Sequence, residues 1–357
     1  MKNMSDMRNE NLQILRFVAA ALVLVTHITF YLHDRISSAH AIWHGGEIGV
    51  PIFFVISGFV MYLSGAKLDR DASSAKFFLA RRVARVFPLY WLITTFKLAI
   101  VILAPAAALH NRPDLWQALA SYVLFPTLNA AGEVRPLHGV GWTLLHEMLF
   151  YYVFSLSLLL RQSPFICSAV IIGALWGAGF FLPADTALAQ VLFSPLNLLF
   201  IAGMALAWQY QHGRRLPLLA AVLALVIGIA TIVSPEIGET LHRMLGGFNA
   251  GAVLIVAAML SLQLNVVPAF KKLLVRLGDS SYSLYLIHPI AAPIICVGLF
   301  KLHVQSPYVI LPIAFVASVI AAHFVYLLVE NPLNKAAWKL LKRTLFSQAP
   351  TPILTEK

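Results

Sequence analysis

Long apolar stretches alternate with short polar segments along almost the whole chain. A helix needs about 20 apolar residues to cross the hydrocarbon core of a bilayer, and the long stretches meet that length. They predict ten membrane-spanning helices, at about residues 12–32, 49–65, 83–106, 142–160, 165–182, 191–210, 216–233, 247–264, 280–300 and 308–329. The sequence therefore predicts an all-α, polytopic integral membrane protein.

One more apolar stretch, WQALASYVLFPTL, lies between the third and fourth predicted spans. It is too short to cross a bilayer and runs into a proline, so we expect a surface or re-entrant piece inside an outer loop. Counting it as a span would make the number of spans odd and would put the two termini on opposite sides of the membrane. The charge pattern argues against that arrangement.

Composition and charge agree with a membrane protein. Hydrophobic residues make up 60% of the 357 residues and charged residues 11%, and the mean hydropathy is +0.80. With the N-terminus inside, most lysine and arginine residues fall on the inner side, which predicts that both termini are cytoplasmic. The net charge of +11 is accounted for by this topology and by anionic lipid headgroups, so we expect no nucleic-acid partner.

The pattern predicts a single membrane domain over residues 1–357, with a helical core at 12–330 and a basic cytoplasmic tail at 331–357. Cys167 and Cys296 both lie in apolar spans, where cysteine acts as a small hydrophobic residue. No cysteine or histidine spacing completes a ligand set for zinc, so we expect no metal.

The first predicted span carries two ionisable residues, Arg16 and His27. They are eleven positions apart, so on a helix their side chains lie within about 20° of one another and roughly 16 Å apart along the axis. Ionisable residues inside a span are costly and commonly functional. The alternative is that Arg16 extends to the headgroups and His27 bonds to a neighbouring helix.

Three arginines lie at the cytoplasmic end of the third predicted span, in the segment AKFFLARRVARVFPLYW. Arg85 follows Arg81 by four residues and Arg82 by three. These spacings cluster the arginines on one side of a helix. Such a cluster suits either a bound polyanion or the lipid headgroups.

Polar residues also interrupt later spans. Glu147 lies a few residues below the outer surface, and Ser57 lies about midway along the second span. In the segment SSYSLYLIHP, Tyr282, Tyr285 and His288 recur every three residues and share a helix face. Small residues near Ser57 and tyrosines near an interface also occur for packing alone.

Counted from the side at which each helix enters, the polar residues form a path across the membrane. The path runs from positive charge inside to His27 and Glu147 in the outer half. An Arg/His/Glu path of this kind suits a transporter or channel as well as an enzyme. The sequence lacks the paired broken helices in inverted repeats that many transporters have.

Six short motifs run in order along almost the whole chain. They comprise Arg16 with His27; Phe53, Phe54, Ser57 and Gly58; Arg82 and Arg85, followed by Pro88; Trp142, Thr143, Glu147, Phe150 and Tyr151; Ser281 to His288; and Glu330 with Pro332. Together they resemble the membrane-bound acyltransferase-3 family, bacterial O-acyltransferases with about ten helices that modify cell-surface and secreted glycans. The segment GEIGVPIFFVISGFVM looks most like the exopolysaccharide-modifying branch.

The resemblance implies an O-acyltransferase of the bacterial inner membrane that uses an acyl-CoA, usually acetyl-CoA. The acceptor would be a sugar hydroxyl of an exopolysaccharide or another cell-surface glycan, either free or carried on a lipid. Coenzyme A bears several phosphates, so it needs cationic recognition at the cytoplasmic side. Arg82 and Arg85, together with Arg81 and Arg16, are expected to supply it.

A sugar hydroxyl is too weak an acid to attack a thioester unaided, so the reaction needs a general base. His27 is the candidate because imidazole titrates in the useful range, Glu147 would orient the ring or stabilise the imidazolium, and Arg16 belongs with them as a catalytic residue. The residues expected to line the site are Ser57, Trp142, Tyr282, Tyr285 and His288. The sequence leaves open whether the acetyl group passes directly or through an acyl-imidazole on His27, and it does not give the oligomeric state.

Overall fold

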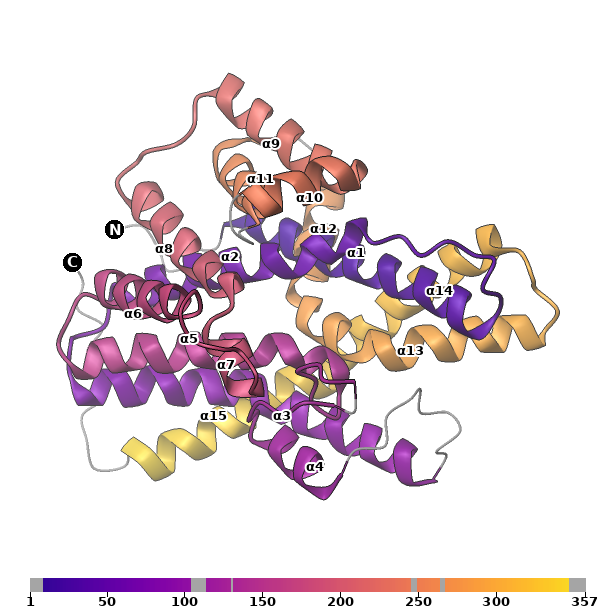
Figure 1. Cartoon of the computed structure of the whole chain (residues 1–357), viewed down its shortest axis with the longest axis horizontal. Helices are drawn as coiled ribbons and strands as arrows, with labels where there is room; N and C mark the ends of the chain where they lie inside the picture. Colours follow the sequence, from indigo (N-terminus) through magenta and orange to yellow (C-terminus); the bar gives the residue numbers. More distant parts are fainter. Residues whose placement is uncertain (1–8, 104–113, 130, 245–248, 264–266, 347–357) are drawn as a thin grey trace. The chain divides into compact units, whose positions relative to one another are not determined.

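The computed structural model describes residues 9–103, 114–129, 131–244, 249–263 and 267–346 of the chain (Figure 1). Within these ranges the regular structure is helical, and the β-contact present is an isolated bridge between Leu128 and Val134. The all-α prediction is therefore confirmed. Residues 347–357 of the predicted tail, and residues 104–106, 247–248 and 264 of the predicted spans, lie outside the described residues.

Seven helical stretches of the described residues are long and apolar enough to cross a membrane. Each coincides with a predicted span, which confirms a polytopic membrane protein. The seven are α1 (Glu10–Arg35); η2 (Gly45–Ile48) with α2 (Gly49–Gly65); α3 (Ala72–Leu103); η4 (Gly139–Gly141) with α5 (Trp142–Leu159); α7 (Ala187–Leu192), η5 (Pro195–Asn197) and α8 (Leu198–Gln211); α13 (Ser281–Lys301); and α14 (Pro307–Val325) with η6 (Tyr326–Glu330) and α15 (Asn331–Phe346).

The other three predicted spans coincide with shorter apolar helices, α6 (Pro164–Ala178), α9 (Leu218–Val233) and α11 (Ala250–Ser261). These helices are shorter than a full crossing usually needs, so the count of ten spans stays a prediction. The stretch expected to be a surface or re-entrant piece forms a helix of eight residues, α4 (Leu115–Tyr122). Two amphipathic helices, α10 (Pro235–Met244) and α12 (Pro268–Asp279), lie between predicted spans.

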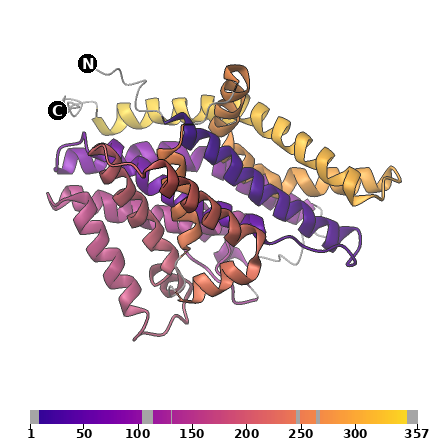
Figure 2. The ribbon, with the colours of Figure 1, turned by 90° about the horizontal axis from the view of Figure 1, so that it is seen from above.

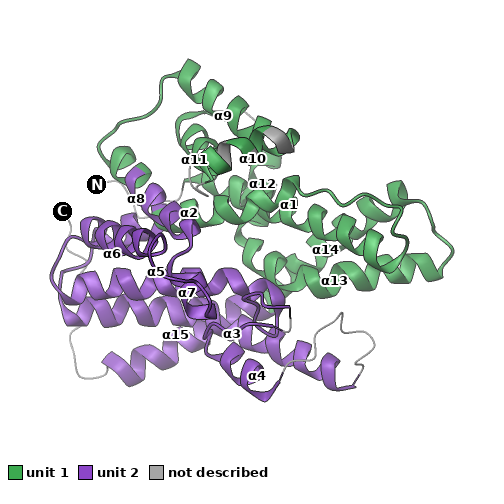
Figure 3. Cartoon of the chain, viewed as in Figure 1, with its two compact units in different colours: residues 1–58, 206–328 green, residues 59–205, 329–357 purple. Residues whose placement is uncertain are grey.

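The chain divides into two compact units (Figure 3). Unit 1 comprises residues 1–58 and 206–328, and unit 2 comprises residues 59–205 and 329–357. Two of the boundaries fall inside α2 and α8, so each of these helices contributes residues to both units. The expectation of one domain over residues 1–357 stays a prediction.

In unit 1, α1 packs against α11, α12, α13 and α14, and α13 runs beside α14 (Figures 1 and 2). Two asparagines fix the start of α1. Asn9 caps the helix by accepting a hydrogen bond from the backbone N–H of Leu12. Asn11 Nδ2 donates to the carbonyls of Met259 (3.0 Å) and Leu262 (2.7 Å), at the end of α11. Helix α1 is therefore held in register with its neighbour from its first turn.

In unit 2, α3 packs against α4, α5 and α15, while α5 also packs against α6 and α7. Aromatic rings fill these contacts. Phe78 of α3 stacks on Phe154 of α5, with 4.5 Å between the ring centroids, and Phe150 of α5 stacks on Phe200 of α8 at 4.6 Å. Because all four side chains are buried, they fix the rotation of α5 about its own axis.

Candidate active site

Two histidines that are far apart in the sequence meet in unit 1. His27 lies on α1 and His288 on α13, and these helices pack against one another. The two imidazole rings lie edge to face with their centroids 4.6 Å apart. His288 is buried and His27 is half-buried. The structure thus brings two of the predicted site residues together.

The backbone fixes the proton position of both rings. His27 Nδ1 lies 2.9 Å from the carbonyl oxygen of Val23, and His288 Nδ1 lies 3.1 Å from that of Leu284. A carbonyl oxygen can only accept, so each Nδ1 must carry the hydrogen and donate it. In the neutral rings, Nε2 therefore holds the lone pair. In this tautomer Nε2 is the ring atom that can take a proton.

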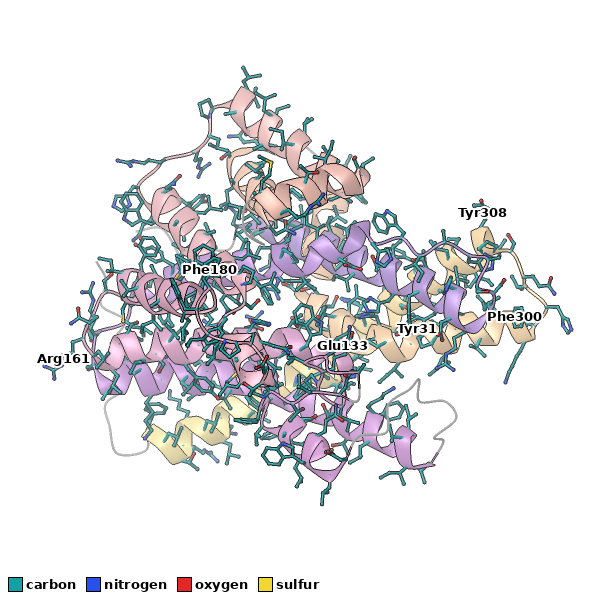
Figure 4. The ribbon with its side chains drawn as sticks, in the orientation of Figure 1. Tyr31, Glu133, Arg161, Phe180, Phe300 and Tyr308 are labelled. Atoms are coloured by element: carbon teal, nitrogen blue, oxygen red, sulfur yellow. The ribbon has the colours of Figure 1, made fainter. Side chains whose placement is uncertain are left out.

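Aromatic side chains surround the histidine pair within unit 1. Tyr285 is tilted against His288 with 5.8 Å between the ring centroids, and Phe53 of α2 meets Tyr285 edge to face at 6.1 Å. Tyr31, labelled in Figure 4, lies one helical turn after His27, 6.4 Å from its ring, and its hydroxyl donates to the carbonyl of Pro289 at 3.4 Å. Tyr31 was not predicted for the site, although its spacing of four residues from His27 could have indicated it.

The remaining predicted residues of unit 1 are spread over three helices. Arg16 is half-buried on α1. Because α1 is a continuous helix from Arg16 to His27, the helical spacing from which their common face was predicted applies. Arg16 is not brought beside the histidine ring, because eleven residues of helix extend about 16 Å. Ser57 on α2 and Tyr282 on α13 are both half-buried.

A second set of polar groups, the arginine–carboxylate set, lies in unit 2. It consists of Arg82 on α3, Ser64 near the end of α2, and Glu147 with Tyr151 on α5. Arg82 Nη2 donates to Ser64 Oγ at 3.1 Å, and its guanidinium lies 5.8 Å from the centre of the Tyr151 ring. The Tyr151 hydroxyl donates to Glu147 Oε1. A half-buried arginine, a phenol and a carboxylate are therefore linked across three helices.

Two residues of this set were missed from the sequence as site residues. Ser64 both accepts from Arg82 and donates to the carbonyl of Met61 at 3.1 Å, so its hydroxyl is held in one orientation. It stands two helical turns after Ser57, a spacing that places both on one face and could have indicated it. Tyr151 belongs to the motif that contains Trp142 and Glu147, and the motif predicts no role for it. The ring of Phe78, 5.2 Å from the guanidinium, closes the apolar side of Arg82.

The three arginines of α3 do not share one environment. The guanidinium of Arg81 lies 4.9 Å from the centre of the Trp338 ring on α15, whereas Arg82 faces α2 and α5. Adjacent residues on a helix point about 100° apart, which explains the divergence. Arg85 is exposed one turn after Arg81. The predicted cluster on one side of a helix therefore holds for Arg81 and Arg85, while Arg82 turns into the protein.

Trp142 and His146 tie the start of α5 to η5. His146 Nδ1 lies 2.9 Å from Asn197 Oδ1, and the Trp142 ring meets the His146 ring edge to face at 5.8 Å. Asn197 Nδ2 donates to the carbonyl of Val191 at 2.7 Å, so its Oδ1 is the acceptor for His146. Trp142, predicted to line the site, thus packs on the residue next to Glu147 and fixes the turn that carries the carboxylate.

The last sequence motif, Glu330 with Pro332, lies where the helix leaves a π-helical turn, η6. Pro332 has no N–H to donate to the preceding turn, which favours a local change of helix type. Glu330 is buried. Among the described side chains, no group of three or more histidine, cysteine, aspartate or glutamate residues could hold a metal ion.

Comparison with known proteins identifies relatives along most of the chain. The sequence profile of a family described as an acyltransferase domain matches residues 9–327. The exopolysaccharide production protein ExoZ of Rhizobium meliloti is 32% identical over 296 residues, which cover 81% of this chain and 89% of ExoZ. The acyltransferase MdmB of Streptomyces mycarofaciens is 27% identical over 310 residues, covering 77% of this chain and 76% of MdmB.

A longer relative matches as well. The peptidoglycan O-acetyltransferase OatA of Listeria monocytogenes is 26% identical in an alignment of 365 positions that covers 90% of this chain and 55% of OatA. No solved structure matches the chain. The profile match across most of the residues, together with the similarity to ExoZ over most of both proteins, shows that this chain belongs to the acyltransferase-3 family.

Proposed function

We propose that this protein transfers an acetyl group from acetyl-CoA to a hydroxyl group of an exopolysaccharide or another cell-surface glycan, either free or lipid-linked. The family makes the protein an acyltransferase. ExoZ is named for exopolysaccharide production and OatA for O-acetylation of peptidoglycan. These relatives support acetyl as the transferred group and a polysaccharide as the acceptor.

The observation that carries the proposal is the paired imidazoles of His27 and His288, 4.6 Å apart among aromatic side chains. His27 Nε2 takes the proton of the acceptor hydroxyl while the hydroxyl oxygen attacks the thioester carbonyl carbon. The carbon–sulfur bond then breaks and the sulfur leaves as a thiolate, which takes up a proton. The products are an acetyl ester on the glycan and free coenzyme A. His288 packs between the rings of His27 and Tyr285.

The donor is proposed to be held by the arginines of α3. Arg82 and Arg85 would contact the phosphates of coenzyme A, since guanidinium groups form paired, charge-assisted hydrogen bonds with phosphate oxygens. Arg82 supports this role because Ser64 and Tyr151 fix its guanidinium. Arg81 is proposed to contribute charge nearby, although its guanidinium packs on Trp338.

Glu147 is proposed as the carboxylate that assists the base. It accepts a hydrogen bond from the Tyr151 hydroxyl, which orients its side chain. The expectation that its charge serves the imidazolium of His27 comes from the sequence motif and stays a prediction. In direct transfer His27 Nε2 acts as the base, whereas in the acyl-imidazole route the same nitrogen would be the nucleophile.

The finer location is also proposed: the inner membrane of a bacterium, with both termini in the cytoplasm. The distribution of lysine and arginine supports this topology, with Arg16 and the arginines of α3 at the cytoplasmic side, where acetyl-CoA is made. The acetyl group would then cross the membrane during transfer. Inverted vesicles given external labelled acetyl-CoA should label glycan trapped in their lumen, whereas labelling confined to external glycan would contradict this topology.

The proposed function is tested in the cell that makes the protein. We expect deletion of the gene to remove ester-linked acetyl signals from the secreted or surface polysaccharide, as seen by NMR. Expression of the intact chain should restore the signals, and expression of His27→Ala should not. Unchanged acetylation of every polysaccharide in the deletion strain would overturn the proposal.

A further inference from the structure

The short helix α4 of unit 2 has its polarity reversed relative to a helix that faces water. No charged residue occurs between Leu115 and Leu128. Four large apolar side chains of this segment are mostly exposed: Leu115 (76%), Trp116 (61%), Leu119 (57%) and Val123 (64%). At about 100° per residue, these four fall within an arc of about 100° on the helix. They form one continuous apolar face, which we call the α4 apolar face.

The polar residues of α4 point inward instead. Gln117 and Ser121 are buried, and Gln117 Nε2 donates to the carbonyl of Arg135 at 2.8 Å. Ser121 Oγ accepts from the backbone N–H of Leu137 at 2.7 Å, and the carbonyl of Ser121 accepts from the Tyr90 hydroxyl at 3.0 Å. The inward face is therefore satisfied by hydrogen bonds, and the hydroxyl of the half-buried Tyr122 pairs with Thr95 Oγ1 of α3 at 2.9 Å.

An exposed apolar face of this kind is unfavourable in water and marks a contact surface. The α4 apolar face suits contact with lipid acyl chains, because the only hydrogen-bonding group among its four side chains is the indole N–H of Trp116. Tryptophan is enriched where a helix meets the boundary between acyl chains and headgroups. The ring of Trp116 packs edge to face on Phe125, which is also exposed, at 6.0 Å and so widens the apolar surface.

The α4 apolar face continues the exposed apolar surface of a membrane span. The indole N–H of Trp91 on α3 donates to the carbonyl of Tyr122 at 2.7 Å, which joins the two helices. Trp91, Leu92 and Phe96 are exposed on α3, and α3 is one of the helices long and apolar enough to cross the bilayer. Because the α4 apolar face adjoins the exposed apolar side chains of α3, lipid that contacts α3 can contact α4 as well.

We propose that α4 lies in the membrane interface, with the α4 apolar face inserted among the lipid acyl chains. At 1.5 Å per residue, its eight residues span about 12 Å, too little to cross the membrane but enough to lie along its surface. The buried polar residues of α4 hold the loop that leads into α5, a loop that includes Glu133 (Figure 4). Helix α4 thus fixes that loop at the level of the membrane surface.

Spin labels on single cysteines test this contact without any measurement of activity. In a background with Cys167→Ala and Cys296→Ala, one label is placed at Leu119→Cys and another, in a separate protein, at Val123→Cys. The matched control is Ala131→Cys, because Ala131 is exposed in the loop outside the α4 apolar face. Each protein is required to elute from size exclusion as the parent does, and is then reconstituted in phosphatidylcholine nanodiscs.

Oxygen dissolved in the acyl chains and a nickel chelate dissolved in water are used as the relaxing agents. We expect the labels at Leu119 and Val123 to collide with the nickel chelate several-fold less, and with oxygen several-fold more, than the label at Ala131. Nickel accessibility equal to that of Ala131 at both positions would overturn the proposal. Strong coupling between labels on two copies in one nanodisc would also overturn it, because a second protomer would then cover the face.

Discussion

The histidine pair of unit 1 and the arginine–carboxylate set of unit 2 are held in different ways. Each imidazole is oriented by the carbonyl four residues earlier on its own helix, 2.9 Å away for His27 and 3.1 Å for His288. Arg82 is oriented by side chains from two other helices, Ser64 and Tyr151. A ring fixed by its own helix keeps its tautomer when neighbours change, whereas a guanidinium fixed by side chains depends on each of them.

This difference suits the chemistry proposed for each set. A general base takes a proton on a nitrogen that carries a lone pair, and a backbone acceptor at Nδ1 places that lone pair on Nε2 in the neutral ring. A phosphate contact needs a positive charge at a fixed position. The rings of Phe78 and Tyr151 limit the motion of the Arg82 guanidinium and contain no acidic group that would neutralise it. Single substitutions in each set test whether these two modes of support behave as the geometry indicates.

The largest effect is expected from His27→Ala. Loss of a general base should lower the turnover number for acetyl transfer by about 100-fold to 10,000-fold while acetyl-CoA affinity stays within a few-fold. His212→Ala is the matched control, since His212 Nδ1 also bonds the carbonyl four residues earlier, that of Trp208 at 2.8 Å, but the residue is exposed and lies outside the site. Near-normal turnover in His27→Ala would remove His27 from the mechanism.

Glu147→Gln is expected to come next. The amide keeps the size of the carboxylate but loses its charge, and a charged hydrogen-bond partner contributes about 1.5–3 kcal/mol, or about tenfold to a hundredfold in rate. Tyr151→Phe removes the donor to the same oxygen and keeps the charge, so we expect a smaller loss of turnover. If both variants lost activity equally in steady-state assays, Glu147 would act only by holding Tyr151.

Arg82→Ala should weaken acetyl-CoA binding by about tenfold or more, because a charge-assisted contact with a phosphate of the donor is lost. Arg81→Ala should have much less effect, since Arg81 packs on Trp338. Isothermal titration of the purified variants with coenzyme A measures both. Equal weakening in the two variants would show that the arginines act as one cluster, against the divergence that the structure describes.

The smallest effect is expected from Ser64→Ala. One hydrogen bond to Arg82 is lost, which costs about 1 kcal/mol, or about fivefold in acetyl-CoA affinity. Ser64→Thr keeps the hydroxyl and should restore most of the affinity. A loss in Ser64→Thr as large as in Ser64→Ala would mean that space at this position, and not the hydroxyl, decides the effect.

The spans could be predicted because a chain in lipid must satisfy its backbone within each helix, so hydropathy and length decide the fold class. The common helix face of Arg16 and His27 could also be predicted, because a continuous helix such as α1 fixes the angle between residues eleven positions apart. The meeting of His27 with His288 could not be predicted, because it depends on how α1 packs against α13. Likewise, the contact of Arg81 with the Trp338 ring depends on how α15 packs on α3, which the sequence does not give.

Some residues could have been found and were not. Tyr31 and Ser64 stand at helical spacings from His27 and Ser57, but tyrosine and serine are common in membrane helices, so their residue types alone indicate nothing. The inward-pointing Gln117 and Ser121 of α4 were hidden for a different reason. Their partners, the backbone groups of Arg135 and Leu137, belong to a loop whose path the sequence does not give.

The central claim is that His27 acts as the base in transfer of an acetyl group to a glycan. The most direct measurement uses purified protein in nanodiscs, carbon-13-labelled acetyl-CoA, and polysaccharide from the deletion strain, with NMR detection of the ester carbonyl. We expect the wild-type chain and His212→Ala to form labelled ester on the glycan, and His27→Ala to form none while still binding acetyl-CoA. Equal ester formation by His27→Ala, or no ester from the wild-type chain, would contradict the account.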